Sequence, residues 1–152
     1  VVTGIAGKKH FSVISLEKDK MNEELGFGRR VLEVLENFNL GFEHLPSGID
    51  TMSVIVQQDK IENIERDISK KLFEVTNSDS ISIEKGITLI AIVGHGMKNM
   101  RGTAAKIFSS LAAKNINIRM IDQGSSELNI IIGVEDSDFE ESIRTIYAQF
   151  WA

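Results

Sequence analysis

The fold is decided by residues 26–43, GFGRRVLEVLENFNLGFE, together with residues 102–119, GTAAKIFSSLAAKNINIR. Each stretch opens on a glycine and carries apolar residues at intervals of three and four, which is the spacing of an amphipathic helix. Each then passes through an asparagine, which tolerates the left-handed conformation found at helix ends, into a short β-type segment. The two stretches lie 76 positions apart, so the chain contains an internal repeat.

The repeat extends outward on both sides at the same offset, with no gap from about residue 11 to about residue 56. Identical pairs at this offset include Ile14 and Ile90, Met21 and Met97, Gly26 and Gly102, Asn39 and Asn115, Gly48 and Gly124, and Ile55 and Ile131. Because the turn glycines and the helix boundaries agree as well, a duplicated unit is favoured over two unrelated α+β stretches.

Strand and helix patterns alternate so that each copy forms a βαββαβ unit. For the first copy we expect strands at 10–16, 42–45, 51–56 and 80–83, and helices near 31–38 and 61–72. For the second copy we expect strands at 87–93, 116–121 and 128–134, a turn at 124–126, and helices near 104–111 and 139–150. One further strand, at 1–6, is predicted to end at Gly7-Lys8-Lys9.

The second copy lacks a fourth strand of its own, which would leave a sheet edge unpaired. The spare strand at 1–6 can fill that place. The sequence therefore predicts an α+β fold with two ferredoxin-like βαββαβ units, each an antiparallel sheet with its helices on one face. The first unit, 9–84, is expected to be inserted into the second, which is formed by 1–8 plus 85–152.

Composition excludes several classes of protein. The 152 residues include no cysteine and carry a formal net charge of −5. A disulfide scaffold, a thiolate metal site and a cysteine nucleophile are therefore excluded, and a reducing cytoplasm is consistent with the composition. An acidic chain without a basic run gives no basis for binding nucleic acid, and no stretch of ~18 apolar residues could span a membrane.

No acid–base pair, nucleophile–base arrangement or metal-ligand spacing is visible in the sequence. We therefore expect no catalytic residue, no metal site and no cofactor in this chain, and a small enzyme of ferredoxin-like fold is disfavoured. Because the chain begins with Val1, we also expect it to be a piece of a longer protein.

The repeated stretches resemble ACT domains, the small-molecule-sensing modules of amino-acid metabolism. More narrowly, the pair is similar to the C-terminal regulatory region of aspartate kinases, through the segments 2–6, 42–50 and 90–94. The resemblance implies feedback inhibition by an end-product amino acid (lysine, or else threonine), a homodimer formed through the ACT units, and a cytoplasmic location. It also implies a kinase domain of the same chain before Val1, which would use ATP and Mg to phosphorylate a carboxylate of aspartate. A stand-alone ACT-type sensor, controlling another enzyme or a transcription factor, is the alternative.

An amino acid offers a carboxylate, which the free N–H groups at the start of a helix can bind, and glycine lets a ligand approach the backbone closely. The loop Met21–Gly28 has these properties. A cationic side chain, as in lysine, also needs a carboxylate, which Glu43 could supply. By resemblance to lysine-inhibited aspartate kinases, the expected ligand-binding residues are Met21, Glu24, Gly26, Phe27, Gly28, Gly41, Phe42 and Glu43, with Asp50 as a second acidic candidate.

Two features of the sequence depart from that pattern or leave it open. Glu23 and Glu24 stand where those relatives carry other residues, and their charges either repel a ligand carboxylate or face water. Met21 and Phe27 could instead serve as packing residues.

The second copy carries Arg119 at the position of Glu43, and this arginine would repel a cationic ligand. We therefore expect the second unit to be structural, or to bind another ligand such as threonine. The candidate residues for that second site are Asn115, Asn117, Ile118 and Gln123.

Overall fold

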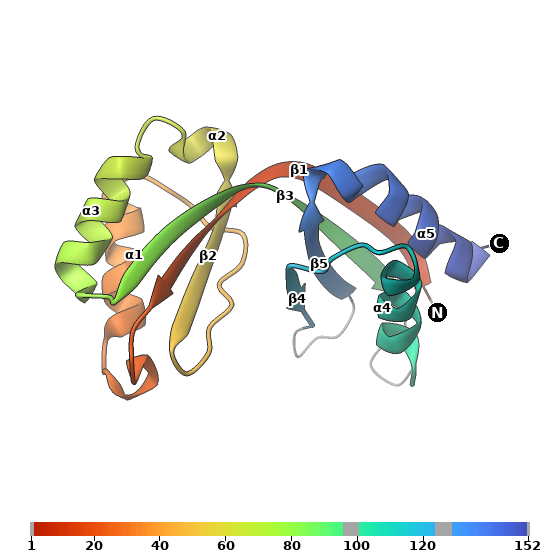
Figure 1. Ribbon diagram of the computed structural model, residues 1–152, viewed down its shortest axis with the longest axis horizontal. Helices are drawn as coiled ribbons and strands as arrows, with labels where there is room; N and C mark the ends of the chain where they lie inside the picture. Colours follow the sequence, from red (N-terminus) through yellow and green to blue (C-terminus); the bar gives the residue numbers. More distant parts are fainter. Residues whose placement is uncertain (1, 96–100, 124–128, 152) are drawn as a thin grey trace. The chain divides into compact units, whose positions relative to one another are not determined.

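The computed structural model describes residues 2–95, 101–123 and 129–151 (Figure 1). The chain divides into two compact units, one formed by His10–Lys85 and the other by Val1–Lys9 with Gly86–Ala152. Two long strands, β1 (Val2–Glu17) and β3 (Ser80–Gly94), contribute one part to each unit. No helix among the described residues is long and apolar enough to cross a membrane.

In the unit His10–Lys85 the strands lie in the order β2-β1-β3. Strand β2 (Thr51–Gln57) is antiparallel to β1, with Val54 opposite Ile14. The segment 42–47 adjoins β2 through two isolated bridges, His44 with Ile55 and Ser47 with Met52. The helical elements of this unit are the short 3-10 helix η1 (Met21–Glu23), α1 (Phe27–Asn37), α2 (Gln58–Ile61) and α3 (Glu65–Thr76).

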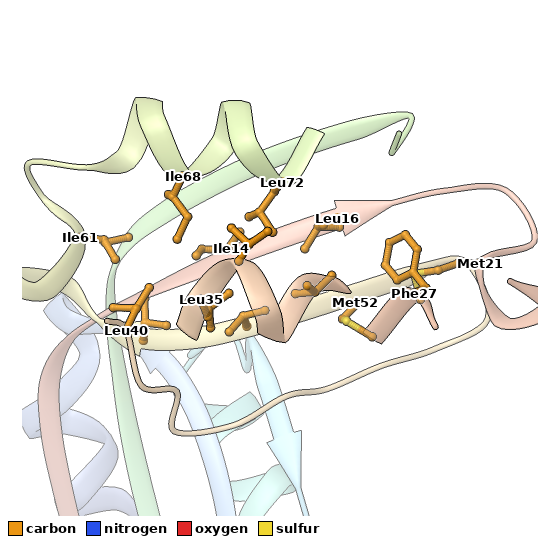
Figure 2. Close-up of a cluster of buried hydrophobic side chains, with 14 residues drawn as sticks. Ile14, Leu16, Met21, Phe27, Leu35, Leu40, Met52, Ile61, Ile68 and Leu72 are labelled. Atoms are coloured by element: carbon orange, nitrogen blue, oxygen red, sulfur yellow. The ribbon is translucent and has the colours of Figure 1, made fainter. Parts of the chain in front are cut away.

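The core of this unit forms between the sheet and the helices α1 and α3 (Figure 2). Alternate residues of β1 and β2 face the helices, and Ile14, Leu16 and Val54 are fully buried. From the helices, Val31 on α1 and Ile68 on α3 are fully buried among them. Both helices therefore lie on one face of the sheet.

In the other unit the strand order is β1-β3-β5-β4, with β4 at Met120–Asp122 and β5 at Asn129–Glu135. Its helical elements are α4 (Thr103–Ala113), the 3-10 helix η3 (Asp136–Asp138) and α5 (Phe139–Trp151). Ile90, Ile92 and Ile132 from the strands pack against Ile107 of α4 and Ile146 of α5, and all five side chains are fully buried. The predicted fold class, α+β with an antiparallel sheet and packed helices, is confirmed.

The repeat is visible in the backbone. Helix α4 begins and ends 76 residues after α1. The glycine before each helix is left-handed, with φ of 82° at Gly26 and 83° at Gly102, and so is the asparagine after it, with φ of 60° at Asn39 and 58° at Asn115. The prediction that asparagine ends these helices is therefore confirmed.

Some predicted boundaries are wrong. The strand at 1–6 does not end at Gly7-Lys8-Lys9 but continues into 10–16 as β1, and 80–83 likewise continues into 87–93 as β3. The glycine-and-lysine segment is simply extended, whereas the left-handed residues in these strands are His10 (φ 71°) and Gly86 (φ 73°).

The shorter predicted elements also differ. The strand expected at 42–45 makes only isolated bridges, the one at 116–121 shrinks to β4, and the helix expected at 61–72 splits into α2 and α3. Edge segments pair on one side only, so periodicity overestimates their length. Met97, Gly124 and the predicted turn at 124–126 lie outside the described residues.

The gap-free offset is wrong beyond β4. His44 pairs with Ile55, whereas Met120, its counterpart in the repeat, pairs with Gly133. The structural counterpart of Ile55 is therefore Gly133 rather than Ile131, and the second copy carries two extra residues in its hairpin. A shift of two residues keeps every side chain on its original face, so the hydrophobic pattern could not reveal it.

Candidate functional site

The predicted ligand-binding residues fall into two groups at different positions along β2. The Met21–Gly28 group lies near the start of β2, where Asn22 N donates to Ile49 O at 3.0 Å. The Gly41–Glu43 group lies further along, where Glu43 N donates to Ile55 O at 2.8 Å.

Figure 2 shows the same separation, with Leu40 at one end of the core and Met21, Phe27 and Met52 at the other. A strand rises by about 3.3 Å per residue, so Met52 and Ile55 alone are about 10 Å apart. One copy of the chain therefore does not gather all the predicted residues into a single pocket.

In the first group the two large apolar side chains are packing residues. Met21 is 4% exposed and Phe27 is 3% exposed, and both belong to the hydrophobic core. A ligand at the start of α1 would therefore meet backbone atoms rather than these side chains. Gly26 suits such an approach because it offers no side chain to cap the first turn, whereas a Cβ at Gly28 would lie 3.6 Å from the side chain of Met52.

Of the two acidic residues of this loop, Glu24 is neutralised by two cations. Lys18 Nζ donates to Glu24 Oε1 at 2.5 Å, and Arg30 pairs with the other carboxylate oxygen. The hydrogen bond from Lys18 is the main reason that the pKa of Glu24 lies below its usual value, and the charge of Arg30 lowers this pKa further. Glu24 therefore neither faces water freely nor presents an uncompensated negative charge to a ligand carboxylate.

The second group lines a pocket of about 280 Å³. Its lining residues are Asn39, Leu40, Gly41, Phe42, Glu43, Gln57 and Lys60. Glu43 Oε1 accepts a hydrogen bond from Gln57 Nε2 at 3.3 Å. The pocket thus holds one carboxylate and one ammonium, and its volume is near the lower end of the range for small-molecule sites.

Sequence reasoning missed Gln57 and Lys60 in this pocket. Gln57 ends a strand and Lys60 lies on a one-turn helix with no motif around it, so only the bridge between His44 and Ile55 brings them near Glu43. Asp50 lies instead with the first group, where its backbone oxygen accepts a hydrogen bond from Lys18 N at 2.9 Å.

The residues expected to form a second site have simpler local explanations. Asn115 provides the left-handed turn after α4, Ile118 packs in part against the core, and Asn117 and Gln123 are exposed. Arg119 pairs with Glu135, with 3.5 Å between its Nη1 and the carboxylate.

The structure also bears on metal binding. Among the described residues, no group of three or more histidine, aspartate or glutamate side chains is arranged to hold a metal ion.

Comparison with known proteins agrees with this picture. Residues 90–150 match the family model described as ACT domain. Aspartokinase 3 of Bacillus subtilis is 38% identical over 152 residues, which are 99% of this chain and 34% of that protein. The solved aspartate kinase of Clostridium acetobutylicum, described as an allosteric enzyme, is 47% identical with a TM-score of 0.95, over 99% of this chain and 35% of that one.

A third similarity concerns the fold alone. The regulatory subunit of aspartate kinase from Thermus flavus has a TM-score of 0.83 at 20% identity, over 98% of both chains. By fold and family model, then, the chain resembles ACT-domain proteins, and the family match lies at residues 90–150. Over nearly its whole length it is similar to the regulatory ACT region of aspartokinases, and it spans about a third of the length of the full aspartokinases it matches.

Proposed function

We propose that this chain is the amino-acid-sensing regulatory region of an aspartate kinase. An end-product amino acid would bind it and shift the enzyme between active and inhibited states, by at most the difference in affinity between those states. The observation that carries the proposal is the small pocket lined by Glu43, because its carboxylate can pair with an ammonium group of an amino acid.

Lysine is the first candidate effector and threonine the second. Glu43 is the only carboxylate among the lining residues of this pocket, and it could pair with the terminal ammonium of lysine. Threonine carries no side-chain cation and would leave that carboxylate to Gln57 alone. The family resemblance of the loop and edge segments supports the same order of preference.

Both compact units are ACT units in this proposal, and the first, predicted as 9–84, is inserted into the second. The division of the chain at His10–Lys85 and the strand order within each unit support this arrangement. Only the first unit carries an acidic residue at the position of Glu43, so we assign the effector to the first unit and a structural role to the second.

A second copy of the chain is the partner that would complete the site. The outer face of α1 bears a groove lined by Arg29, Leu32, Glu33 and Glu36. This face is self-complementary, because a two-fold axis near Leu32 places Arg29 of one copy against Glu36 of the other. Antiparallel packing of two α1 helices would bury Leu32 and exchange two ion pairs.

The same two-fold axis joins the two groups of predicted ligand-binding residues. In an antiparallel helix pair, the start of α1 in one copy lies beside the end of α1 in the other. Gly26–Gly28 would then face Asn39–Gly41 of the second copy, next to the pocket with Glu43. The effector carboxylate would meet the helix start of one copy and its side chain the Glu43 pocket of the other.

The rest of the enzyme belongs to the proposal as well. A kinase domain of the same polypeptide would use ATP and Mg in the cytoplasm to phosphorylate a carboxylate of aspartate. The alternative is a stand-alone ACT sensor, and the full-length gene distinguishes the two hypotheses. A kinase coding region upstream of Val1 supports our proposal, and its absence supports the alternative.

Calorimetric titration of the chain with lysine and threonine tests the effector assignment. We expect lysine to bind, and Glu43→Ala to weaken its binding at least about tenfold, because a charge-assisted hydrogen bond is lost. Glu74→Ala, on the exposed face of α3, is the matched control and should leave affinity unchanged. If neither amino acid gives heat or raises the melting temperature, the effector proposal is wrong.

A further inference from the structure

Lys18, which directly follows β1, contacts two separate parts of its unit. Its ammonium contacts Glu24 Oε1 at 2.5 Å and donates to the backbone oxygen of Thr76 at 2.8 Å. It also lies 6.0 Å from the centre of the Phe27 ring, and its side chain is 20% exposed. One cation thus joins the loop before α1 to the last residue of α3.

The contact with α3 is favourable for a general reason. The last carbonyl groups of a helix have no partner within it, and a cation near them interacts well with the helix dipole. Thr76 is 1% exposed, and its hydroxyl donates to Leu72 O at 2.7 Å. The anchor on this side is therefore a buried, hydrogen-bonded helix end.

The contact with Glu24 extends this anchor into the proposed effector site. Glu24 follows η1 and precedes Gly26, and its second oxygen pairs with Arg30 in the first turn of α1. The order of contacts runs from α3 through Lys18 and Glu24 to the start of α1. Lys18 therefore helps to fix the loop whose backbone would meet the effector carboxylate, together with the hydrogen bonds from Asn22 N to Ile49 O and from Asp19 N to Asp79 Oδ2.

The other unit shows that this arrangement is not a requirement of the fold. The repeat has Gly94 at the position of Lys18 and Met100 at the position of Glu24, and neither carries a charge. Yet α4 begins and ends at the same places as α1 after the same left-handed glycine. The ion pairs are thus an addition to the unit that we assign to effector binding.

We propose that Lys18 is a positioning residue of the effector site, which acts through Glu24 to hold the loop 19–26 against the end of α3. Glu24, expected from sequence to touch the ligand, is in this view part of the support for the loop. The inference rests on the proposed function for its link to the effector, whereas the holding of the loop stands on the contacts alone.

The test compares Lys18→Met, which keeps the apolar stem but removes the ammonium, with Lys18→Arg, which restores a cation. Lys71→Met on the exposed face of α3 is the matched control. Amide hydrogen exchange would follow the turn hydrogen bonds from Glu23 N to Lys20 O and from Glu24 N to Met21 O. We expect exchange there to accelerate at least about tenfold in Lys18→Met only, with circular dichroism and the amides of α4 unchanged.

Calorimetry gives a second measurement, the affinity for lysine, which would not change if Lys18 had a purely structural role. At a temperature where all variants are folded, Lys18→Met should weaken lysine binding about tenfold, and Lys18→Arg should recover most of it. Glu24→Gln should weaken lysine binding similarly. The double variant Lys18→Met with Glu24→Gln should bind lysine no more weakly than the single variant of lower affinity, because both changes break the same series of contacts.

Each result decides a separate point. Unchanged loop exchange in Lys18→Met overturns the positioning role, and so does faster exchange with unaltered effector affinity. If the unaltered chain binds neither lysine nor threonine, the proposed function fails, and the exchange measurement alone then decides whether Lys18 holds the loop.

Discussion

At the scale of a single residue, the charge of Glu24 shows how context changes what a side chain can do. Two acidic residues in a loop expected to receive a carboxylate look unfavourable for binding. Lys18 and Arg30 remove that difficulty for Glu24, because two cations surround one anion. The carboxylate of Glu24 therefore adds no uncompensated negative charge to the loop.

The lowered pKa of Glu24 predicts a dependence of stability on pH. A carboxyl whose native pKa lies below its unfolded value of 4.5 contributes stability above pH 4.5 and loses it as the pH falls through the native value. The melting temperature of Glu24→Gln should therefore fall below that of the unaltered chain near pH 7, and the difference should shrink as the pH drops below 4.5. Thermal unfolding followed by circular dichroism measures both.

Glu62→Gln provides the control for that experiment, since Glu62 is exposed just after α2. Its melting temperature should differ little from that of the unaltered chain at any pH. A difference for Glu24→Gln that stays constant from pH 7 to pH 3 would contradict the ion-pair explanation.

At the scale of elements, α1 and α4 are equivalent helices of the repeat, and their boundaries coincide at the offset of 76 residues. Both follow a glycine at φ near +83°, a conformation in which any other residue is strained. The surroundings differ: a Cβ at Gly26 would lie 3.2 Å from Arg30 Nη1, whereas one at Gly102 would meet nothing within 4 Å.

This pair of glycines separates backbone strain from side-chain displacement. Gly102→Ala should cost about 1–2 kcal/mol from the left-handed backbone alone. Gly26→Ala should cost a similar amount and should in addition push Arg30 away from Glu24. Urea unfolding gives the cost of each change, and only Gly26→Ala should accelerate amide exchange in the loop before α1. Equal exchange in both variants would argue against the role of Arg30.

Local chemistry explains which elements could be predicted from the sequence. Helix spacing, Gly26 and Asn39 are local signals, and they located α1 and, through the repeat, α4. The two-residue shift at Gly133 preserves the hydrophobic pattern, so no sequence argument could detect it. The continuous strand β1 was missed because Gly7-Lys8-Lys9 has turn composition but extended backbone.

The sequence predicted the candidate site less completely than it predicted the fold. Glu43 could be chosen because its chemistry suits a cation. Lys60 and Lys18 could not, because their importance depends on contacts with residues distant along the chain, such as Thr76. A contact across 58 positions leaves no periodic trace.

At the scale of the whole molecule, the proposed effector site has two halves that lie in different places of one copy of the chain. In our proposal the start of α1 receives the carboxylate and the Glu43 pocket the cation, but β2 keeps the two about 10 Å or more apart. Assembly of two copies would bring the start of α1 of one copy next to the Glu43 pocket of the other. Effector binding and dimerisation would then be linked, so each should strengthen the other.

Charge exchange on α1 tests this assembly. Arg29→Glu should weaken the dimer, because acidic groups of both copies would then face each other, and Glu36→Arg should weaken it by placing cations together. Two contacts are altered in each case, so a total of about 1–2 kcal/mol, or roughly a 5- to 30-fold higher dissociation constant, is expected. The double variant Arg29→Glu with Glu36→Arg restores opposite charges and should recover the dimer, as sedimentation equilibrium would show.

Lysine titrations of the same variants test whether effector binding depends on the dimer. Each single variant should bind lysine more weakly at protein concentrations below its dimer dissociation constant, and the double variant should regain the part of the affinity that depends on assembly. Neither Arg29 nor Glu36 lines the Glu43 pocket. Arg29 lies beside Gly26, so its replacement also changes the charge at the start of α1. Glu62→Arg, away from the α1 groove, controls for the change in net charge. If the double variant stays as monomeric as the singles, α1 does not pair in the antiparallel manner described, and the two halves of the site must be joined by another surface.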